Sequence, residues 1–205
     1  LYDNWESKNS KIAHTDLVKC GSSEFPPTHP ITSNRLSNKE IFKVNIGKRI
    51  VETQLVENGK YPVFSANVFK PFGTVNKDLP IEDLDFSTSS ILWGIDGDWQ
   101  VNHVPANTPF YPTDHCGVLR VKTNEVEPKY LAWALYKIGK TQRFSRTIRA
   151  SIDRIEALII KFPPIEEQQK IVKEVEKYET KISEAQKIIE KSAEEKRKIL
   201  EKYLN

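Results

Sequence analysis

Residues 158–172 read LIIKFPPIEEQQKIV and divide the chain into two different kinds of sequence. Before the Pro-Pro pair at 163–164 lie short apolar runs separated by turn residues, and after it follows one long charged pattern. Two prolines cannot continue a preceding helix, whereas a proline is tolerated in the first turn of a new one. Glu166 and Glu167 favour that start, because acidic side chains suit the positive end of the helix dipole. We therefore predict a globular domain that ends at the proline pair and a long helix over 163–205.

The long helix has an apolar stripe with coiled-coil spacing. Alternating steps of four and three from Ile171 meet apolar or aromatic side chains, which are Val175, Tyr178, Ile182, Ala185 and Ile189. A helix over 165–204 would be roughly 60 Å long at about 1.5 Å per residue. Because an apolar stripe needs cover, we predict a partner helix, from another copy or from another part of the parent chain. The alternative is a helix folded back on its own domain, which we disfavour because of this length.

Short strands and turns are predicted for the globular part over 41–162, and an irregular lead-in is predicted for 1–40. Apolar or alternating runs predict strands over 41–46, 61–65, 72–75, 90–95, 98–102, 116–121 and 158–162. Asp96-Gly97 predicts a tight hairpin turn, because such a pair accepts positive φ angles. One short helix is predicted from Pro128 to a stop at Gly139, and another is capped by Ser151. Together these elements indicate an α+β fold with a mixed or antiparallel sheet.

Size and composition limit the classes of protein to which this chain can belong. The 205 residues, 38% hydrophobic and 29% charged, suffice for one domain and an appendage. No apolar run reaches membrane-spanning length, so we expect no membrane partner. Cys20 and Cys116 suit free thiols in a reducing cytoplasm. The chain has no methionine, even at position 1, and we expect it to be a piece of a longer polypeptide.

Basic residues gather in one part of the globular domain. Positions 137–154 contain one acid, Asp153, and six basic residues, which are Lys137, Lys140, Arg143, Arg146, Arg149 and Arg154. On a chain with a net charge of only +3, such a stretch indicates a docking surface for a polyanion. A solvated face that only keeps the protein soluble is an equally good interpretation of the charge pattern.

No set of residues has the spacing of a catalytic or metal site. His115 and Cys116 beside Asp114 lack the second ligand pair that a metal needs. Asp96-Gly97-Asp98 lacks the twelve-residue spacing of a calcium loop and suits the hairpin turn instead. There is no Gly-rich phosphate loop, and no nucleophile accompanied by a base. We therefore predict no catalytic residues, no metal and no cofactor.

Several short motifs follow one another between Phe42 and Val172. They are Ile46-Gly47-Lys48-Arg49, Tyr61-Pro62-Val63-Phe64-Ser65-Ala66-Asn67, Ile91-Leu92-Trp93-Gly94-Ile95-Asp96-Gly97, Pro112-Thr113-Asp114-His115 and Phe162-Pro163-Pro164-Ile165-Glu166-Glu167-Gln168. In this order they resemble one repeat of a type I restriction–modification specificity subunit. The last motif, followed by a long helix, is the most specific mark of that family.

The resemblance implies a role in DNA recognition. In that family each target-recognition domain reads one half of a split DNA site, and its helix is a spacer that docks the methyltransferase and restriction (translocase) subunits. The usual subunit has two such repeats, whereas this chain has one. Three parent proteins fit a single repeat: a half-subunit that acts as a homodimer, one half of a longer subunit, or a methyltransferase fusion. Residues 146–155 resemble the fused kind slightly more.

Our interpretation is a non-catalytic module that recognises double-stranded DNA and directs an adenine methyltransferase or endonuclease to a split site. Phosphate contacts, which position a domain without reading sequence, are predicted for Lys48, Arg49, Lys140, Arg143, Arg146 and Arg149. Base readout is predicted for Asn67, Asp98 and Asn102, because amides and carboxylates pair with adenine and cytosine edges. Two alternatives remain open: a coiled-coil interaction scaffold without specific DNA binding, and an enzyme whose site the pattern does not reveal.

Overall fold

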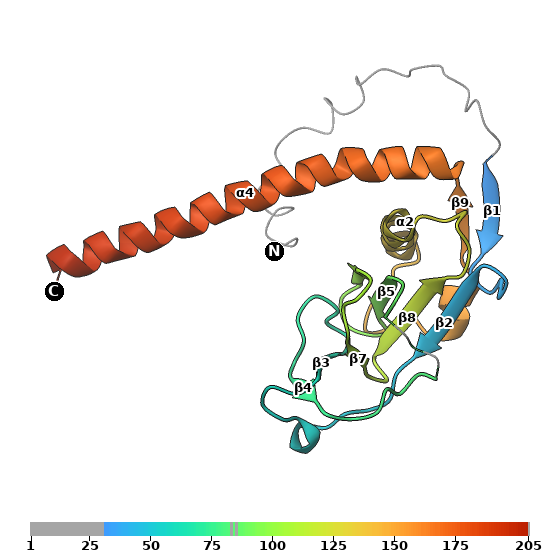
Figure 1. Cartoon of the computed structure of the whole chain (residues 1–205), viewed down its shortest axis with the longest axis horizontal. Coiled ribbons are helices and arrows are strands. Elements are labelled where there is room, and N and C mark those ends of the chain that lie inside the picture. The colour runs from blue at the N-terminus through green and yellow to red at the C-terminus, as the bar shows by residue number, and fades with distance from the viewer. Residues whose placement is uncertain (1–30, 83, 85, 205) are drawn as a thin grey trace. The chain divides into compact units, whose positions relative to one another are not determined.

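A computed structural model describes residues 31–82, 84 and 86–204, and Figure 1 shows their arrangement. Residues 1–30, with Cys20 and most of the predicted lead-in, lie outside the described residues. In chain order the elements are β1 (Thr32–Arg35), β2 (Phe42–Ile46), the 3₁₀ helix η1 (Glu52–Gln54), β3 (Tyr61–Phe64), β4 (Thr74–Val75), β5 (Ser90–Gly94), β6 (Val101–Val104), β7 (Tyr111–Pro112), β8 (Cys116–Val121), α2 (Pro128–Thr141), α3 (Ile152–Glu156), β9 (Ile159–Phe162) and α4 (Ile165–Leu204).

The main sheet has the antiparallel order β2-β8-β5-β6. The predicted hairpin of β5 and β6 is confirmed, with Trp93 opposite Val101, and Gly97 has the expected positive φ of 82°. The predicted tight turn is wrong, because the connection runs from Ile95 to Gln100. Trp99 leaves the strand since its buried ring donates a hydrogen bond from Nε1 to the carbonyl of Tyr136 in α2, 2.9 Å away.

Two smaller sheets complete the fold. Strands β4, β3 and β7 form one of them, in which β3 and β7 run parallel, so the predicted α+β fold with mixed sheets is confirmed. Strand β1 pairs antiparallel with β9, Thr32 lying opposite Phe162. The domain was predicted to begin at residue 41, whereas this pairing gives residues 32–35 of the supposed lead-in a regular strand. The sequence TSNR has no strand pattern of its own, and only the distant β9 orders it.

The helix α2 continues through Gly139, which was wrongly predicted to end it. A Cβ atom at Gly139 would lie 2.2 Å from Cε2 of Trp99, so the glycine permits close packing of the helix on the hairpin. Ser151 takes the predicted cap position of α3, but its side chain makes no capping hydrogen bond.

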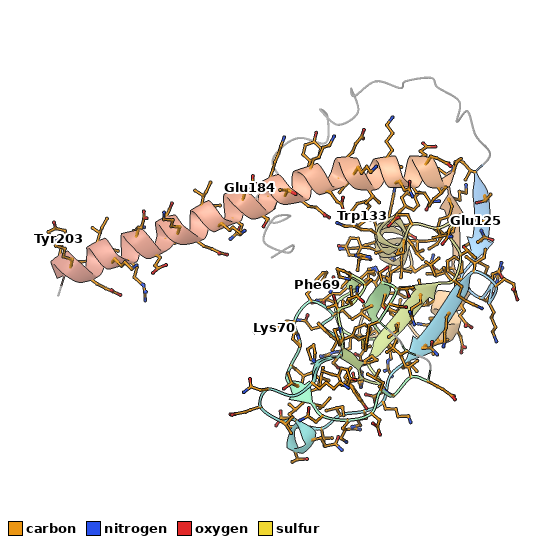
Figure 2. The ribbon with its side chains drawn as sticks, viewed as in Figure 1. Phe69, Lys70, Glu125, Trp133, Glu184 and Tyr203 are labelled. Atoms are coloured by element: carbon orange, nitrogen blue, oxygen red, sulfur yellow. The ribbon has the colours of Figure 1, made fainter. Side chains whose placement is uncertain are left out.

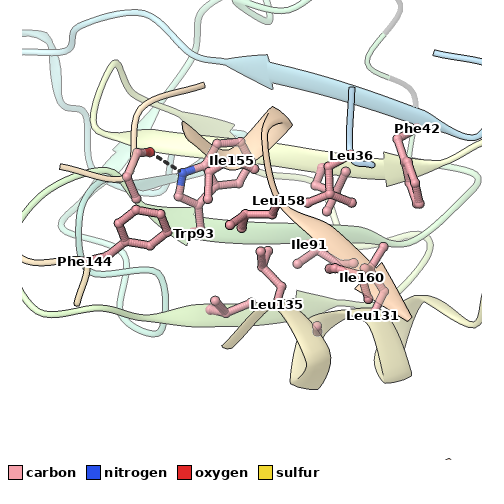
Figure 3. Close-up of a cluster of buried hydrophobic side chains, with 14 of the residues drawn as sticks. Leu36, Phe42, Ile91, Trp93, Leu131, Leu135, Phe144, Ile155, Leu158 and Ile160 are labelled. Carbon is pink, nitrogen blue, oxygen red and sulfur yellow. Dashed lines mark hydrogen bonds between the residues drawn. The ribbon is translucent and has the colours of Figure 1, made fainter. Parts of the chain in front are cut away.

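The largest core cluster lies between one face of the main sheet and the elements α2, α3 and β9. Figure 3 shows Ile91 and Trp93 of β5 packed with Leu131 and Leu135 of α2 and with Ile155 of α3. The indole Nε1 of Trp93 donates a hydrogen bond to the carbonyl of Ala150, 2.9 Å away, which ties the basic stretch to the sheet.

A second cluster covers the opposite face of the sheet. Side chains alternate between the two faces of a strand, so Leu92 points away from its neighbour Trp93. Leu92 packs with Val68, Phe110 and Cys116, all of them buried. The segment around Val68 is therefore held against the sheet on the side away from α2.

The long helix α4 runs over residues 165–204, within the range 163–205 that we predicted for it. Figure 1 shows its first turns beside α2. Its 40 residues correspond to roughly 60 Å at about 1.5 Å per residue. Of the helices in the described part of the chain, none is long and apolar enough to cross a membrane.

Candidate nucleic-acid interface

One end of the main sheet gathers loops from five parts of the chain. Register places Ile46 opposite Gly117 and Gly94 opposite Cys116, so β2 and β5 end where β8 begins. The loops at this end, which we call the sheet-end loops, are 47–49, 66–70, 95–100, 113–115 and 145–150. Backbone hydrogen bonds join them, from Gly47 N to Thr113 O (3.1 Å) and from Ile95 N to His115 O (3.1 Å). The predicted DNA-binding residues thus lie mostly on adjacent loops.

The basic stretch is attached directly to the β5–β6 hairpin. The amide of Ala150 donates to the carbonyl of Ile95, 2.8 Å away, and the rings of Phe144 and Trp99 are 5.0 Å apart. Between these attachments lies a pocket of about 310 Å³, lined by Gly97, Asp98, Ser145, Arg146 and Thr147. The structure therefore brings together Arg146 and Asp98, one predicted for phosphate and the other for a base.

The other predicted cations of this stretch differ in their surroundings. Arg143 is exposed and has a positive φ of 56°, directly after α2. The Lys140 ammonium lies 5.3 Å from the centre of the Tyr136 ring, on the helix itself. Arg149 Nη2 lies 3.6 Å from Oδ2 of Asp96, so an acid already offsets part of its charge.

Asp96 is also the partner of His115, whose Nδ1 lies 3.0 Å from the same Oδ2. Cys116, next in sequence, points into the second core cluster, and burial raises the pKa of its thiol. The two side chains therefore do not form a shared site. In the ranges 31–82, 84 and 86–204, no three His, Cys, Asp or Glu residues are grouped as a metal site requires.

Asn67 and Asn102 hold the backbone of one sheet-end loop. Oδ1 of Asn67 accepts hydrogen bonds from the amides of Phe69 and Lys70, both 3.0 Å away. Nδ2 of Asn102 donates to the carbonyl of Val68 at 2.7 Å. These contacts differ from the predicted base readout, which residue type suggested but which needs a free amide edge. Direct base contact by either side chain stays a prediction.

Lys48 and Arg49 are exposed on the loop that follows β2. Gly47 lets this loop pass close to β7, since a Cβ there would lie 1.9 Å from the carbonyl oxygen of Pro112. The two cations consequently stand beside loop 113–115. Phosphate contact by them also stays a prediction.

Gln168 fixes the start of α4, a role that the sequence did not reveal. Its side chain is fully buried; Oε1 accepts from the amide of Glu127 at 2.9 Å, and Nε2 donates to the carbonyls of Glu125 (3.0 Å) and Pro163 (2.8 Å). Figure 2 labels Glu125 at this junction. The only sequence signal was the position of Gln168 in the Glu-Glu-Gln motif, because a glutamine among charges otherwise indicates a surface.

A second contact joins α4 to α2. The Lys129 ammonium lies 3.1 Å from a carboxylate oxygen of Glu176 and 2.8 Å from one of Glu179. Burial opposes the charge of Lys129, but hydrogen bonds to Glu179 and Glu176 raise its pKa overall. We call Ile165–Glu179, which contains these contacts, the root of α4, and Thr180–Leu204 its arm.

The predicted coiled-coil stripe is largely uncovered. Val175 is half-buried in the root, whereas Tyr178 is 65%, Ile182 68% and Ile189 60% exposed, and Ala185 is exposed as well. Glu184 and Tyr203, labelled in Figure 2, lie on the same arm. The alternative of a helix folded back on its own domain therefore applies to the root only.

Comparison with known proteins identifies the family. The model of the type I restriction modification DNA specificity domain matches residues 30–191. The type I restriction enzyme MpnII specificity subunit of Mycoplasma pneumoniae is 27% identical over 176 residues, which are 82% of this chain and 50% of that protein. S.MpnORF285P of the same bacterium, which bears the name of a type I specificity subunit, is 31% identical over 173 residues, or 82% of this chain and 55% of that one. The chain thus spans about half the length of the curated relatives it matches.

Solved structures share the fold. The S subunit of a type I restriction–modification system from M. genitalium superimposes with a TM-score of 0.58 at 19% identity, covering 78% of this chain and 42% of that one. The HsdS subunit from Thermoanaerobacter tengcongensis gives a TM-score of 0.58 at 15% identity, covering 80% and 41%. The chain belongs to the family of type I restriction–modification DNA specificity domains.

Proposed function

We propose that the chain recognises DNA sequence as one target-recognition domain, with its spacer helix, of a type I specificity subunit. The observation that supports this most strongly is the family match over residues 30–191. The geometry agrees with it, because exposed cations and polar side chains meet on the sheet-end loops. The match does not favour the alternative of a scaffold without DNA binding.

The sheet-end loops divide the work of DNA binding in this proposal. Arg146, Lys48 and Arg49 of these loops, together with Arg143 just before loop 145–150, hold phosphates and orient the domain. Arg149 contributes less, since Asp96 already offsets its charge. Asp98, beside Arg146 in the pocket, accepts a hydrogen bond from a cytosine amino group.

Catalysis belongs to other proteins in this account. The chain directs an adenine methyltransferase and an endonuclease, and it neither methylates nor cleaves DNA itself. Its partners are a methyltransferase subunit or domain, a restriction subunit and a second recognition domain. A solved structure that concerns complex assembly of the type I system has the same fold, with a TM-score of 0.54 over 80% of this chain.

The spacer sets the distance between two half-sites. We keep the predicted domain boundary at residue 163 and extend the domain start from residue 41 to include β1. The helix α4 is then the element that connects two recognition domains. An antiparallel pair of such helices places two recognition domains at opposite ends of a rod of about 60 Å. At about 3.4 Å per base pair, this allows a gap of no more than roughly 18 base pairs.

The test is the salt dependence of DNA binding by the double variant Arg143→Ala, Arg146→Ala. Each lost phosphate contact lowers the slope of log affinity against log salt by about one unit, so we expect a decrease of about two. Adding Arg149→Ala lowers it by less than one further unit. The matched control is Lys187→Ala, Lys196→Ala, which removes the same charge from the arm. An unchanged slope in the arginine variant, or an equal change in the control, contradicts the proposed interface.

A further inference from the structure

Phe69 is an apolar side chain held outside the protein. It is 55% exposed in the sheet-end loop 66–70, between the fully buried Val68 and the exposed Lys70. Figure 2 labels Phe69 and Lys70 side by side on the domain. A flexible loop would turn such a ring inward, because burying it removes apolar surface from water.

Hydrogen bonds from neighbouring side chains hold the backbone of this loop. Asn67 binds the amides of Phe69 and Lys70 through Oδ1, and Asn102 binds the carbonyl of Val68 through Nδ2. The amide of Val68 donates to Oε1 of Gln100 at 3.2 Å. Three amide side chains are therefore used to order one turn.

The sheet itself adds to this support. A Cβ atom at Gly94 would lie 2.4 Å from the carbonyl oxygen of Ala66, so the loop rests directly on the backbone of β5. Side chains locked by packing and hydrogen bonds are typical of a preorganised binding site. The ordered turn thus presents the exposed ring of Phe69, with the basic Lys70 next to it in sequence.

We propose that Phe69 is a wedge that enters the base stack of the target DNA, while Lys70 holds an adjacent phosphate. This rests on the proposed function. An apolar side chain flanked by cations is the arrangement with which proteins unstack a base step. The cations are Lys70, next to Phe69 in sequence, and Arg146 and Lys48 on neighbouring loops at the same end of the sheet. A protein surface would be a poorer partner for a ring amid so much positive charge.

The wedge gives Asn67 and Asn102 an indirect role in recognition. In this proposal their hydrogen bonds position the turn that carries Phe69. Specificity from Phe69 then depends on how easily a base step unstacks, which differs between sequences. Pyrimidine–purine steps are the most readily opened, so we expect one at the wedge position.

The experiment begins with the chain selecting a duplex from a random pool. 2-Aminopurine, which fluoresces more strongly when unstacked, then replaces one base at a time in the selected sequence. With the wild type we expect a several-fold increase at one or two neighbouring positions. Phe69→Ala removes the increase and weakens binding about tenfold. Phe69→Trp keeps it, and so does the matched control Phe72→Ala, which removes another exposed ring from the same segment.

Each other outcome has a definite meaning. If the wild type binds the selected duplex but no position brightens, or if brightening survives in Phe69→Ala, the wedge is overturned and the proposed function stands. An equal loss in Phe72→Ala overturns the assignment to Phe69. Weaker binding of a methyltransferase subunit by Phe69→Ala, with DNA binding unchanged, shows a protein contact instead. If no sequence is enriched, the proposed function fails and the wedge with it.

Discussion

The root and the arm of α4 have similar sequences and very different surroundings. Both mix Lys and Glu with apolar residues at coiled-coil spacing. In the root, Gln168 and Val172 are buried and Lys129 of α2 pairs with two glutamates. In the arm every side chain is exposed apart from the half-buried Gln186, and Ile182 remains 68% exposed.

The difference shows that a stripe of apolar residues does not reveal what covers it. Polar contacts at the root fix where the helix leaves the domain. The arm has only pairs within the helix, such as Glu194 with Lys198, and these are worth little because solvent screens them. A rigid joint with an uncovered stripe beyond it is what a spacer needs.

The largest expected effect comes from charging the stripe of the arm. Ile182→Asp with Ile189→Asp buries unpaired acids wherever the arm meets a partner helix, at a cost of about 3 kcal/mol or more. We expect the wild type to associate through α4 and the double variant to sediment as a monomer with unchanged domain stability. Ser183→Asp with Lys187→Asp, which adds acids away from the stripe, is the control. A wild type that stays monomeric at high concentration, with the arm folded onto the domain, contradicts the spacer.

Removing the buried amide of the root should have the next largest effect. Gln168→Ala leaves one backbone N–H and two carbonyls without their partner, which we expect to lower the free energy of unfolding by about 3 kcal/mol. Urea unfolding measures it. The exposed neighbour Gln169→Ala is the matched control and should change the midpoint little. Similar midpoints for the two variants would mean that Gln168 does not hold the joint.

A smaller, pH-dependent effect is expected from His103 on β6, close to the root. Burial and the charge of Lys129 lower its pKa, while Glu127, Glu176 and Glu179 oppose the shift. The unfolded chain then binds a proton more readily than the folded one, so stability present above about pH 6.5 is lost as the pH falls below it. We expect His103→Gln to reduce this loss between pH 7.5 and 5.5 in thermal unfolding. An identical pH dependence in both proteins would rule out the shift.

Local patterns predicted most of the fold, and distant contacts explain what they missed. The long helix follows from its periodicity. The β5–β6 hairpin follows from two apolar runs on either side of Asp96-Gly97, although the connection is longer than that pair predicts. Strand β1 could not be found, because its polar residues pair only with a strand more than a hundred positions away. Gly139 resembles a helix stop in sequence, but α2 continues through it. A glycine is needed there because the ring of Trp99 packs against the helix backbone.

The candidate site was predicted less well, for the same physical reason. Charge identified the basic stretch, and the fold brings Arg146 to the hairpin. Residue type suggested Asn67 and Asn102 as base readers, yet hydrogen bonds direct both amides to the backbone. Whether an amide faces a base or its own chain depends on three-dimensional contacts that composition does not contain.

The most direct test of the account is the ratio of two affinities at about 150 mM salt. One is the affinity of the chain for the duplex it enriches from a random pool, and the other is for the same duplex with the half-site scrambled. Each mismatched base pair costs about 1–3 kcal/mol, so a half-site of a few pairs should give a ratio of at least about a hundred. A ratio near one, or no enrichment at all, would contradict the claim that this chain reads DNA sequence.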